Sequence, residues 1–587
     1  MRQVSTPGDP QFHKFLTPQQ FLARFGPADA DVRTVTAALQ RYGLSVEQAT
    51  STTLRATGTP ASLETAFGVT LHLYEVAAQG TAPAYSFHAP LQPPQVPAGA
   101  AGLVSAVVGL DTRPQFRPLS MQAPAALRNG QYRQRSGPAG LTNPLGYLTV
   151  KDFAQYYDVQ PLYAKGLTGS GRTIGIVTLA NSTPSDAFTY WNSLGLKVDS
   201  NRITIVNVDG GPGAPSDASG SGETTLDVEQ AGGIAPGAKI IVYMAPNTHQ
   251  SLLDVFAAAI DANTADSISV SWGTWEWYLN LENTPVTDPF TGKTVSALQA
   301  FHELFVQAAI QGQSLFSGSG DSGAYEVHRD IVPYPSGYSI PLSVFFPASD
   351  SAITAGGGTT LPGTQTYGSI VITIPQERVW GWDYLVPTCQ PHQTPLACGL
   401  FSVGGGGGVS VFFPVPFYQL GLSGVQASQP GQAFVDHAVT PPYTFFALPA
   451  NYRGRNLPDV SFNADPKTGY IIGYTPSDAN DYPNDGCTSG QYCSLPFEGG
   501  TSFVGPQLNG VTALLSQNAH QRLGFLNPAL YLLADLGFAN QTGGLPLRYI
   551  SSGDNWFYYG RNGYSPAAGL GVIDVAKLAA ALGFRGF

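Results

Sequence analysis

Charged residues are scarce in this chain of 587 residues, and several common sequence signals are missing. Asp, Glu, Lys and Arg make up 11% of the residues, against roughly 25% in an average soluble protein. The formal net charge is −11 and no block of basic residues occurs, which argues against nucleic acid as a partner. No apolar run reaches the roughly 18 residues of a transmembrane helix, so we expect no membrane partner. Residues 1–11 contain no apolar core of a signal peptide either.

Glycine (68 residues), proline (47 residues) and aromatic side chains (11%) are plentiful instead, and 43% of the residues are hydrophobic. A chain of this length with this much apolar material is expected to form more than one domain. A polar surface with little charge suits acidic surroundings, because paired carboxylates are protonated there and cease to stabilise the fold. The alternative is that the low charge reflects genomic composition alone.

The four cysteines stand in two locally spaced pairs, Cys389 with Cys398 and Cys487 with Cys493. No C-x-x-C step of a zinc site is present. Two disulfides between these near neighbours are the simplest pairing and would fit an extracytoplasmic protein, whereas free buried thiols are the alternative.

Three regions can be separated along the chain. Residues 1–113 mix short helical and extended patterns. Residues 114–147 are rich in Pro, Gln, Arg, Gly and Asn without an apolar period, which indicates an exposed linker. From residue 148 to residue 587, short apolar runs alternate with helical stretches, which predicts a parallel sheet covered by helices on both faces. The predicted strands include 52–56, 71–76, 173–179, 239–244 and 267–271, and the predicted helices include 32–42, 60–67, 252–262 and 295–310.

A serine at position 502 carries the first candidate for chemistry. It ends the run Gly-Gly-Thr-Ser at 499–502 and precedes Pro506, which a helix tolerates only near its first turn. Apolar residues then recur at helical spacing. Ser502 is therefore expected at a helix N-terminus, where free N–H groups favour developing negative charge. A simple helix cap is the alternative.

Two carboxylates stand four residues apart at Glu223 and Asp227, so that one helix face would carry both. The helix is predicted from residue 223 to 231, with glycines 232 and 233 ending it. Like charges placed in this way repel, and one of the two pKa values is usually raised. Acids on a solvated helix surface are the alternative.

A third carboxylate, Asp321, follows a predicted strand in a Gly/Ser turn, at the edge of a parallel sheet where ligands bind. None of the nine histidines precedes a glycine, so the His-Gly step of subtilisin-type helices is absent. In acid, at a pH of about 4, a histidine is almost wholly protonated and cannot accept a proton, whereas a carboxylate can. Serine with three acids thus suggests a serine nucleophile served by a carboxylate base. Asp321, as a protonated acid, would donate a hydrogen bond to an oxyanion; a solvated turn aspartate is the alternative.

These residues lie within a series of motifs that resembles the sedolisin, or serine-carboxyl peptidase, family over nearly the whole chain. No single motif is specific, but their order is. They are Glu-x-x-x-Asp at 223–227, Ile-Ala-Pro-Gly-Ala-Lys at 234–239, Ser-Val-Ser-Trp-Gly at 269–273, Ser-Gly-Asp-Ser-Gly at 319–323, Phe-Pro-Ala-Ser at 346–349, the glycines at 404–408 with Phe-Pro at 413–414, Pro-Asp-Val-Ser at 458–461 and Gly-Gly-Thr-Ser at 499–502.

The resemblance implies a subtilisin-like fold and an acid-active endopeptidase. It implies Ser502 as the nucleophile, Glu223 as its base, Asp227 as the residue that orients Glu223, and Asp321 as the oxyanion partner. Reaction would proceed through an acyl-enzyme. The expected partners are protein or peptide substrates and the chain's own prodomain, and the expected form is a secreted monomer.

Residues 1–113 resemble the prodomain of the same family, which implies a ferredoxin-like α/β fold that inhibits the enzyme until it is removed. The carrying stretches are Phe-Leu-Thr-Pro at 15–18, Ala-Phe-Gly-Val at 66–69 and Val-Val-Gly-Leu at 107–110. The strand and helix that normally precede the Leu-Thr-Pro step are missing, which leaves a truncated start or a reduced prodomain as alternatives. Processing is expected in the linker, before about residue 148.

The C-terminal region departs from the family, which usually binds one calcium ion there. The matching positions are Tyr549 and Ile550, then Gly563 and Ser565, and they lack both of the family's aspartates. Calcium prefers several hard oxygen ligands that include carboxylates. We therefore predict no cofactor and a calcium site that is absent or weak.

Two other functions compete with an acid-active peptidase. One is a catalytically silent relative that binds peptides, which would require a broken set of residues, whereas all four positions are intact. The other is a hydrolase of the subtilisin type that works at neutral pH, against which the missing His-Gly step argues. Substrate preference, the processing site and the pH optimum are not encoded in any recognisable motif.

Overall fold

The computed structural model describes residues 1–77, 84–114, 116–128, 140–282, 286–287, 294–331, 334–478, 482 and 485–583. Within them lies one large sheet with the strand order β27-β28-β29-β24-β16-β14-β10-β7-β9-β8, and β19 pairs with β16 at the side. The β16–β19 and β28–β29 pairs are antiparallel and the other neighbours are parallel. Its strands are β7 (Thr173–Thr178), β8 (Ile203–Asn207), β9 (Lys239–Met244), β10 (Ser267–Val270), β14 (Ser314–Gly318), β16 (Thr354–Thr360), β19 (Arg378–Val379), β24 (Val460–Asn463), β27 (Ala539–Asn540), β28 (Leu547–Arg548) and β29 (Val572–Ile573).

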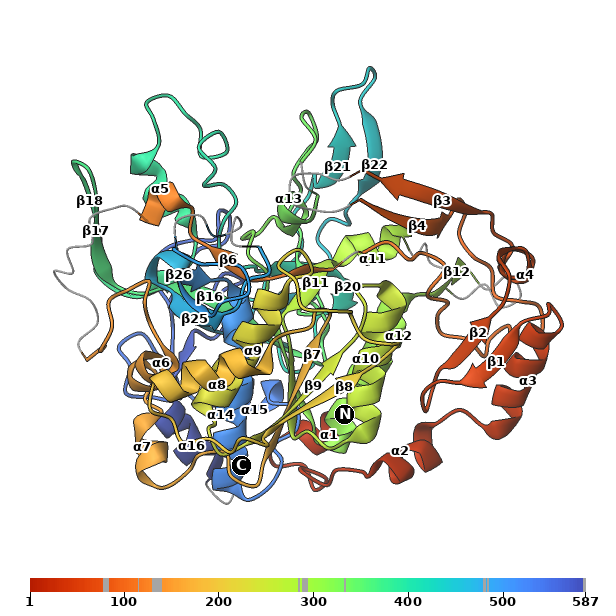
Figure 1. Cartoon of the computed structure of the whole chain (residues 1–587), viewed down its shortest axis with the longest axis horizontal. Coiled ribbons are helices and arrows are strands. Elements are labelled where there is room, and N and C mark those ends of the chain that lie inside the picture. The colour runs from red at the N-terminus through yellow and green to blue at the C-terminus, as the bar shows by residue number, and fades with distance from the viewer. Residues whose placement is uncertain are drawn as a thin grey trace.

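Helices cover both faces of this sheet, as the sequence predicts for a buried parallel sheet. Alternate side chains of β7 enter two separate cores: Ile174 and Ile176 enter one, and Val177 enters the other. The first core contains helices α9 and α14, and the second contains α10 and α12 (Figure 1). The helices of the catalytic region are α6 (Val150–Tyr156), α7 (Gln160–Ala164), α8 (Pro184–Ser193), α9 (Ser221–Ile234), α10 (His249–Ala262), α11 (Glu276–Glu282), α12 (Ala297–Gln311), α13 (Glu326–Asp330), α14 (Val504–Ala519), α15 (Asn527–Asp535) and α16 (Val575–Gly583).

Helix α9 is longer than the sequence predicts, because Gly232 and Gly233 lie inside it instead of ending it. A Cβ atom at Gly232 would meet the Trp191 ring at 2.4 Å, and one at Gly233 would meet Val150 at 2.8 Å. The two glycines therefore provide close packing against α8 and α6 rather than a stop signal. The packing environment overrides a helix propensity that is unfavourable by about 1 kcal/mol for each glycine.

The N-terminal region forms a small α/β unit beside α10 and α12, at the right of Figure 1. Its strands pair as two antiparallel hairpins, β1–β2 and β3–β4. A core of its own, which includes Val35, Leu39 and Phe67, holds the helices against them. Its elements are α1 (Arg2–Ser5), α2 (Pro18–Phe25), α3 (Asp29–Gln40), β1 (Ser45–Gln48), β2 (Leu54–Thr57), α4 (Pro60–Phe67), β3 (Leu71–Val76) and β4 (Tyr85–Pro90).

The segment after this unit is not the exposed linker that the sequence predicts. Residues 129–139 lie outside the described residues, but Phe116, Leu119 and Ala123 are all buried. Strand β5 (Arg117–Pro118) pairs with β11 (Trp272–Trp275), β6 (Met121–Gln122) pairs with β26 (Cys493–Gly499), and α5 (Ala125–Arg128) follows. In Figure 1 the segment crosses from the N-terminal unit on the right to α5 on the left. The partners that bury it are remote in sequence, so its own composition does not reveal them.

Smaller strand pairs surround the main sheet. Both predicted disulfides, Cys389–Cys398 and Cys487–Cys493, are present. Among the described residues, no helix is long and apolar enough to cross a membrane. The remaining strands and 3-10 helices are β12 (Val286–Thr287), β13 (Thr294–Val295), β15 (Phe345–Phe346), β17 (Gly363–Tyr367), β18 (Ile370–Ile374), β20 (Gly408–Pro414), β21 (Ala433–Asp436), β22 (Tyr443–Ala447), β23 (Gly454–Leu457), β25 (Tyr470–Tyr474), η1 (Trp382–Thr388), η2 (Pro466–Thr468) and η4 (Thr501–Phe503).

Candidate active site

Ser502 lies in η4, between the end of β26 and the N-terminus of α14, and Gly500 connects β26 to η4. Its position at a helix N-terminus agrees with the prediction. The side chain is fully buried. Gly500 has a φ of +107°, and a Cβ atom there would meet the carbonyl oxygen of Leu119 at 1.9 Å and Asp321 Oδ2 at 2.6 Å. Only glycine fits both this conformation and this space. The carbonyl oxygen of Leu119 and Asp321 Oδ2 therefore lie beside each other on one side of Gly500, which directly precedes Thr501 and Ser502.

Glu223 and Asp227 lie in the first two turns of α9 and are 1% and 0% exposed, so the structure excludes a solvated helix face. The Ser120 amide donates to Glu223 Oε2 at 2.8 Å. The Ser271 hydroxyl donates to Asp227 Oδ1 at 2.7 Å and lies 3.3 Å from the carbonyl oxygen of Ser502. Ser271 thus connects the carboxylate pair to the backbone of the candidate nucleophile.

Asp321 follows β14 and is also buried, at 2% exposure. Its Oδ1 atom accepts from the Thr501 amide at 2.7 Å and from the Thr501 hydroxyl at 2.9 Å. The same hydroxyl accepts from the Gly320 amide at 3.0 Å. Asp321 is therefore held against the residue that precedes Ser502, while its second oxygen is turned toward Leu119.

The four candidate groups share one property. Glu223 Oε1, Asp227 Oδ2, Asp321 Oδ2 and Ser502 Oγ are buried, and among the described residues none of these atoms has a hydrogen-bond partner within normal limits. The groups still influence one another: the Ser502 side chain lowers the pKa of Glu223 and the charge of Asp321 raises it. Buried polar atoms are almost always satisfied in folded proteins. Four buried polar atoms without hydrogen-bond partners in one region indicate a site where a reacting group can bind.

Burial is the main cause of raised pKa values in this site. It raises the pKa of Glu223 to about 7, although Ser120 and Ser502 act to lower it. It also raises the pKa of Asp227 well above its usual range, with the charge of Glu223 as the second cause. It also raises the pKa of Asp321 to about 6, against the lowering effects of Arg329 and Thr501. In acidic solution burial therefore favours the neutral form of all three carboxyl groups, and Glu223 accepts a proton only from its ionised fraction.

The buried segment of the linker passes through this site as an extended chain. The Leu119 amide donates to the carbonyl oxygen of Ser271 at 3.1 Å, next to the β5–β11 pairing, and β6 pairs with β26 beyond the site. The carbonyl group of Leu119 lies near Asp321 Oδ2, and the following amide, that of Ser120, contacts Glu223. The Leu119–Ser120 peptide bond therefore lies among the four candidate groups.

Several residues that take part in the site have no role in the sequence-based prediction. Ser271 belongs to the quoted Ser-Val-Ser-Trp-Gly motif, but its contact with Asp227 depends on tertiary structure. Arg329, in α13, donates to the carbonyl oxygen of Pro118. The apolar side chain of Leu119 is fully buried in a cluster with Val344, Phe345, Ala348, Ala355 and Leu457. No local pattern identifies these contacts.

The C-terminal positions named for calcium do not form a carboxylate cage in the structure. Ser565 Oγ accepts from the Ala568 amide at 3.3 Å. Asp554 Oδ1 accepts from the Trp556 amide at 2.9 Å, and Asp574 pairs with Lys577. In the described part of the chain, no three His, Cys, Asp or Glu residues gather in a way that could hold a metal ion. These donors do not fit the ligand set that calcium requires.

Comparisons with known proteins agree on one family. The sequence profile described as "Pro-kumamolisin, activation domain" matches residues 1–113. Kumamolisin of Bacillus sp. (strain MN-32) is 30% identical over 586 residues, which cover 98% of this chain and 87% of kumamolisin. Sedolisin of Pseudomonas sp. (strain 101) is 28% identical over 601 residues, which cover 100% of this chain and 84% of sedolisin. The solved structure of Pseudomonas sedolisin complexed with pseudo-iodotyrostatin has a TM-score of 0.53 at 26% identity and covers 76% of this chain and 100% of that chain.

The fold and these relatives define a serine-type peptidase that carries its own activation domain. The chain belongs to the sedolisin family of serine-carboxyl peptidases and is a kumamolisin-like proenzyme. The predicted fold class, a subtilisin-like parallel α/β sheet preceded by a prodomain, is confirmed.

Proposed function

We propose that the chain is the proenzyme of an acid-active serine-carboxyl endopeptidase whose first substrate is its own Leu119–Ser120 bond. The observation that carries the proposal is the path of the linker, which brings this bond beside Glu223 and beside Asp321, whose carboxyl group contacts Thr501 next to Ser502. A hydrolase needs its scissile carbonyl and its leaving nitrogen held beside separate proton-transfer groups. Here the nitrogen contacts one carboxylate and the carbonyl oxygen lies beside another.

In the first step Ser502 Oγ attacks the carbonyl carbon of Leu119 while Glu223 takes the hydroxyl proton. Asp227, which keeps its own proton, shares the pair's network and is fixed by the Ser271 hydroxyl. Negative charge develops on the carbonyl oxygen of Leu119. Asp321 in its neutral form donates a hydrogen bond from Oδ2 to that oxygen, since its Oδ1 atom already accepts two bonds from Thr501.

In the second step Glu223 returns the proton to the Ser120 nitrogen, and the C–N bond breaks. The distance of 2.8 Å between this nitrogen and Glu223 Oε2 allows direct transfer. Leu119 is then bound to Ser502 as an ester. Water attacks the ester with Glu223 again accepting a proton, and Ser502 is regenerated.

The non-prime side of the cleft supports an endopeptidase rather than an exopeptidase that removes short peptides from a free N-terminus. Phe116 is the fourth residue before the Leu119–Ser120 bond. Its amide donates to Asn247 Oδ1 at 3.1 Å, and Asn247 Nδ2 donates back to its carbonyl oxygen at 2.8 Å. An extended chain of at least four residues therefore lies before the bond, continuous with the prodomain.

The pocket that holds Leu119 supports a preference for leucine or a similar apolar residue before the cleaved bond. Its walls are the buried side chains of Val344, Phe345, Ala348, Ala355 and Leu457. Burying a leucine in such a pocket contributes about 2 kcal/mol. The two disulfides and the low charge of the sequence support secretion into acidic surroundings.

Acid incubation of the purified chain tests the proposal. Mass spectrometry should show a new N-terminus at Ser120, and unfolded protein added afterwards should be digested at about pH 4 but not at pH 8. Ser502→Ala should abolish both reactions, and Leu119→Asp should suppress cleavage at this bond. Cleavage of the Ser502→Ala chain by itself, or activity confined to neutral pH, would contradict the proposal.

A further inference from the structure

The chain beyond the Leu119–Ser120 bond is held by side chains as well as by strand pairing. Met121 and Gln122 pair with Gly499 and Glu498 of β26, and the Ala123 amide donates to the carbonyl oxygen of Phe497 at 3.0 Å. The register of the residues after the bond is therefore fixed by the strand that leads into Ser502. Among these residues, the side chain of Gln122 makes hydrogen bonds with the catalytic region.

Asp485 faces the third residue after the bond. Gln122 Nε2 donates to Asp485 Oδ2 at 3.2 Å and to the carbonyl oxygen of Pro496 at 3.1 Å. Arg128, at the end of α5, donates from one guanidinium nitrogen to both Asp485 oxygens, at 2.7 and 2.9 Å. The side chains of Asp485 and Arg128 are 4% and 12% exposed. In the proenzyme the linker itself thus satisfies this carboxylate.

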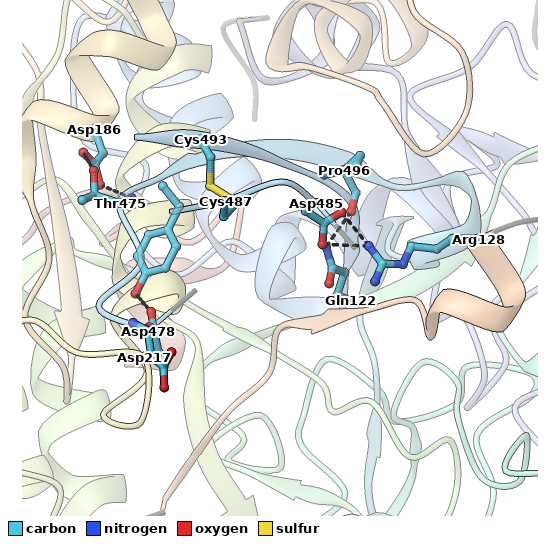
Figure 2. The surroundings of a disulfide bond; sticks show 11 residues. Gln122, Arg128, Asp186, Asp217, Thr475, Asp478, Asp485, Cys487, Cys493 and Pro496 are labelled. Carbon is cyan, nitrogen blue, oxygen red and sulfur yellow. Dashed lines mark hydrogen bonds and ion pairs between the residues drawn. A yellow bond between two sulfur atoms is a disulfide. The ribbon is translucent and has the colours of Figure 1, made fainter. Parts of the chain in front are cut away.

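The loop that carries Asp485 is tied down on both arms (Figure 2). Two residues after Asp485, Cys487 is bonded to Cys493, the first residue of β26. On the arm away from the linker, the Thr475 amide and hydroxyl both donate to Asp186 at 2.8 Å. Figure 2 shows the disulfide between the Asp186–Thr475 contact on one side and Asp485, with Gln122 and Arg128, on the other. Asp485 therefore lies two residues from a disulfide that connects it to β26, the strand that leads into Ser502.

We propose, building on the endopeptidase function above, that Asp485 forms a substrate subsite that selects a basic side chain three residues after the cleaved bond. After cleavage, the segment from Ser120 to Arg128 becomes the free N-terminus of the catalytic region, and a substrate can displace it from the cleft. Displacement removes Gln122 and Arg128 from Asp485 and leaves the carboxylate open to a side chain of the substrate. A lysine in place of Gln122 is one bond longer and brings a cation to the same oxygen. Charge-assisted hydrogen bonds are stronger than neutral ones, so lysine should be favoured over glutamine and glutamine over an apolar residue.

Three quenched fluorescent peptides test the subsite on the acid-activated enzyme. They share leucine before the bond and differ only at the third position after it, which is Lys, Gln or Met. We expect kcat/KM to be about 10-fold higher for the Lys peptide than for the Met peptide, with Gln between them. Asp485→Asn should reduce this ratio to less than 2-fold, because the amide no longer attracts the cation of the Lys peptide.

Two further variants separate recognition from loop structure. Asp478→Asn changes another carboxylate of the same loop, on the arm whose backbone contacts Asp217, and should keep the parent's ratio. Asp485→Lys should reverse the preference, so that a peptide with Glu at the third position becomes the better substrate. An equal loss for all three peptides in Asp485→Asn would assign Asp485 a purely structural role and overturn the proposal.

The outcomes also distinguish this proposal from the proposed function. If the parent cleaves the three peptides at equal rates, the subsite is excluded while the endopeptidase function stands. If the parent cleaves none of them, and no unfolded protein either, both are overturned.

Discussion

Two groups of buried carboxylates in the catalytic region differ in how they are satisfied. Asp459 accepts from Arg455 through both oxygens, at 3.0 and 2.7 Å, and also from Tyr531 and from the Ala355 amide. Asp152 accepts from side chains and amides of Thr142, Asn143 and Thr149. The candidate catalytic residues, in contrast, each keep one oxygen without a partner.

Carboxylates of the first group stabilise the fold through their hydrogen bonds. Carboxylates of the second group are buried by the fold although one oxygen of each has no partner among the described residues. Burial acts to raise the pKa of Asp152, but its many hydrogen bonds outweigh burial and lower it. For Asp227 and Asp321 the balance goes the other way, and the pKa values are raised. Many hydrogen bonds thus favour the charged form of Asp152, whereas burial without them favours the neutral forms of Asp227 and Asp321.

Removing the proposed base should give the largest effect. Glu223→Gln keeps the shape of the side chain but cannot accept the Ser502 proton, so autoprocessing and peptide hydrolysis should fall about 10³- to 10⁴-fold. The rate of appearance of the Ser120 N-terminus measures this.

Glu229→Gln is the matched control for that variant. Glu229 lies on the same helix, is equally buried and accepts from the Gly473 amide, so its replacement should leave the rates within a few-fold of the parent. A similar loss in both variants would mean that any buried acid of α9 matters only for folding.

Breaking a satisfied pair should affect stability instead. Arg455→Met leaves the fully buried Asp459 without its cation. Because an unpaired buried charge is costly, the free energy of unfolding should fall by about 3–5 kcal/mol. Urea unfolding in a Ser502→Ala background, which prevents self-digestion, measures the change.

The partly exposed pair of Arg378 and Asp383 provides the comparison for Arg455. Arg378→Met should cost about 1 kcal/mol or less. Equal costs at the two sites would show that burial does not govern these ion pairs.

The pH dependence of stability should have opposite signs in the two groups. The pKa of Asp321 is raised to about 6, so its stabilising contribution is complete below the unfolded value of about 4 and is lost as the pH rises through 6. Between pH 4 and 7 this amounts to about 3 kcal/mol. The lowered pKa of Asp152 gives a contribution that is present at neutral pH and lost in acid.

Unfolding in urea at pH 7, at pH 4 and at about pH 2 checks these signs, because the contribution of Asp152 is lost only below the unfolded pKa of about 4. In the Ser502→Ala background, Asp321→Asn should reduce the stability lost at pH 7, and Asp152→Asn should reduce the stability lost at the acid end. If Asp321→Asn leaves the difference between pH 4 and pH 7 unchanged, this aspartate is not protonated in the folded proenzyme.

Much of the fold could be predicted because it depends on local patterns. The predicted strands at 71–76 and 239–244 and the helix at 60–67 agree with β3, β9 and α4 residue for residue. The end of α9 was wrong, because Gly232 and Gly233 pack against Trp191 and Val150, which the sequence cannot place.

The site could be predicted only in part, for the same physical reason. Ser502, Glu223, Asp227 and Asp321 stand in recognisable motifs, and the structure brings them together, but their roles stay predictions. The residues that bury Leu119 lie more than 200 residues away in sequence, and the contacts of Asp485 join segments more than 350 residues apart. The linker's own composition indicated exposure. Pairing partners across that separation leave no local signal.

Removal of divalent cations should have the smallest effect on stability. This result would show that the C-terminal carboxylates, like Asp459 and Asp152, already have partners within the protein. Asp554 already accepts from the Trp556 amide, and Asp574 already pairs with Lys577. Neither stands at Tyr549 or Ser565, the two positions where the family has its aspartates. Chelation with EDTA should therefore shift the thermal midpoint of the Ser502→Ala chain by less than about 1 °C, which corresponds to about 1 kcal/mol for a chain of 587 residues. The purified protein should hold far less than one calcium per chain by elemental analysis.

Tyr549→Asp combined with Ser565→Asp restores the two carboxylates and should raise calcium affinity, because hard oxygen ligands are what the present loop lacks. One tightly bound ion in the parent chain, with a fall of many degrees on chelation, would show that backbone and hydroxyl oxygens alone hold calcium there.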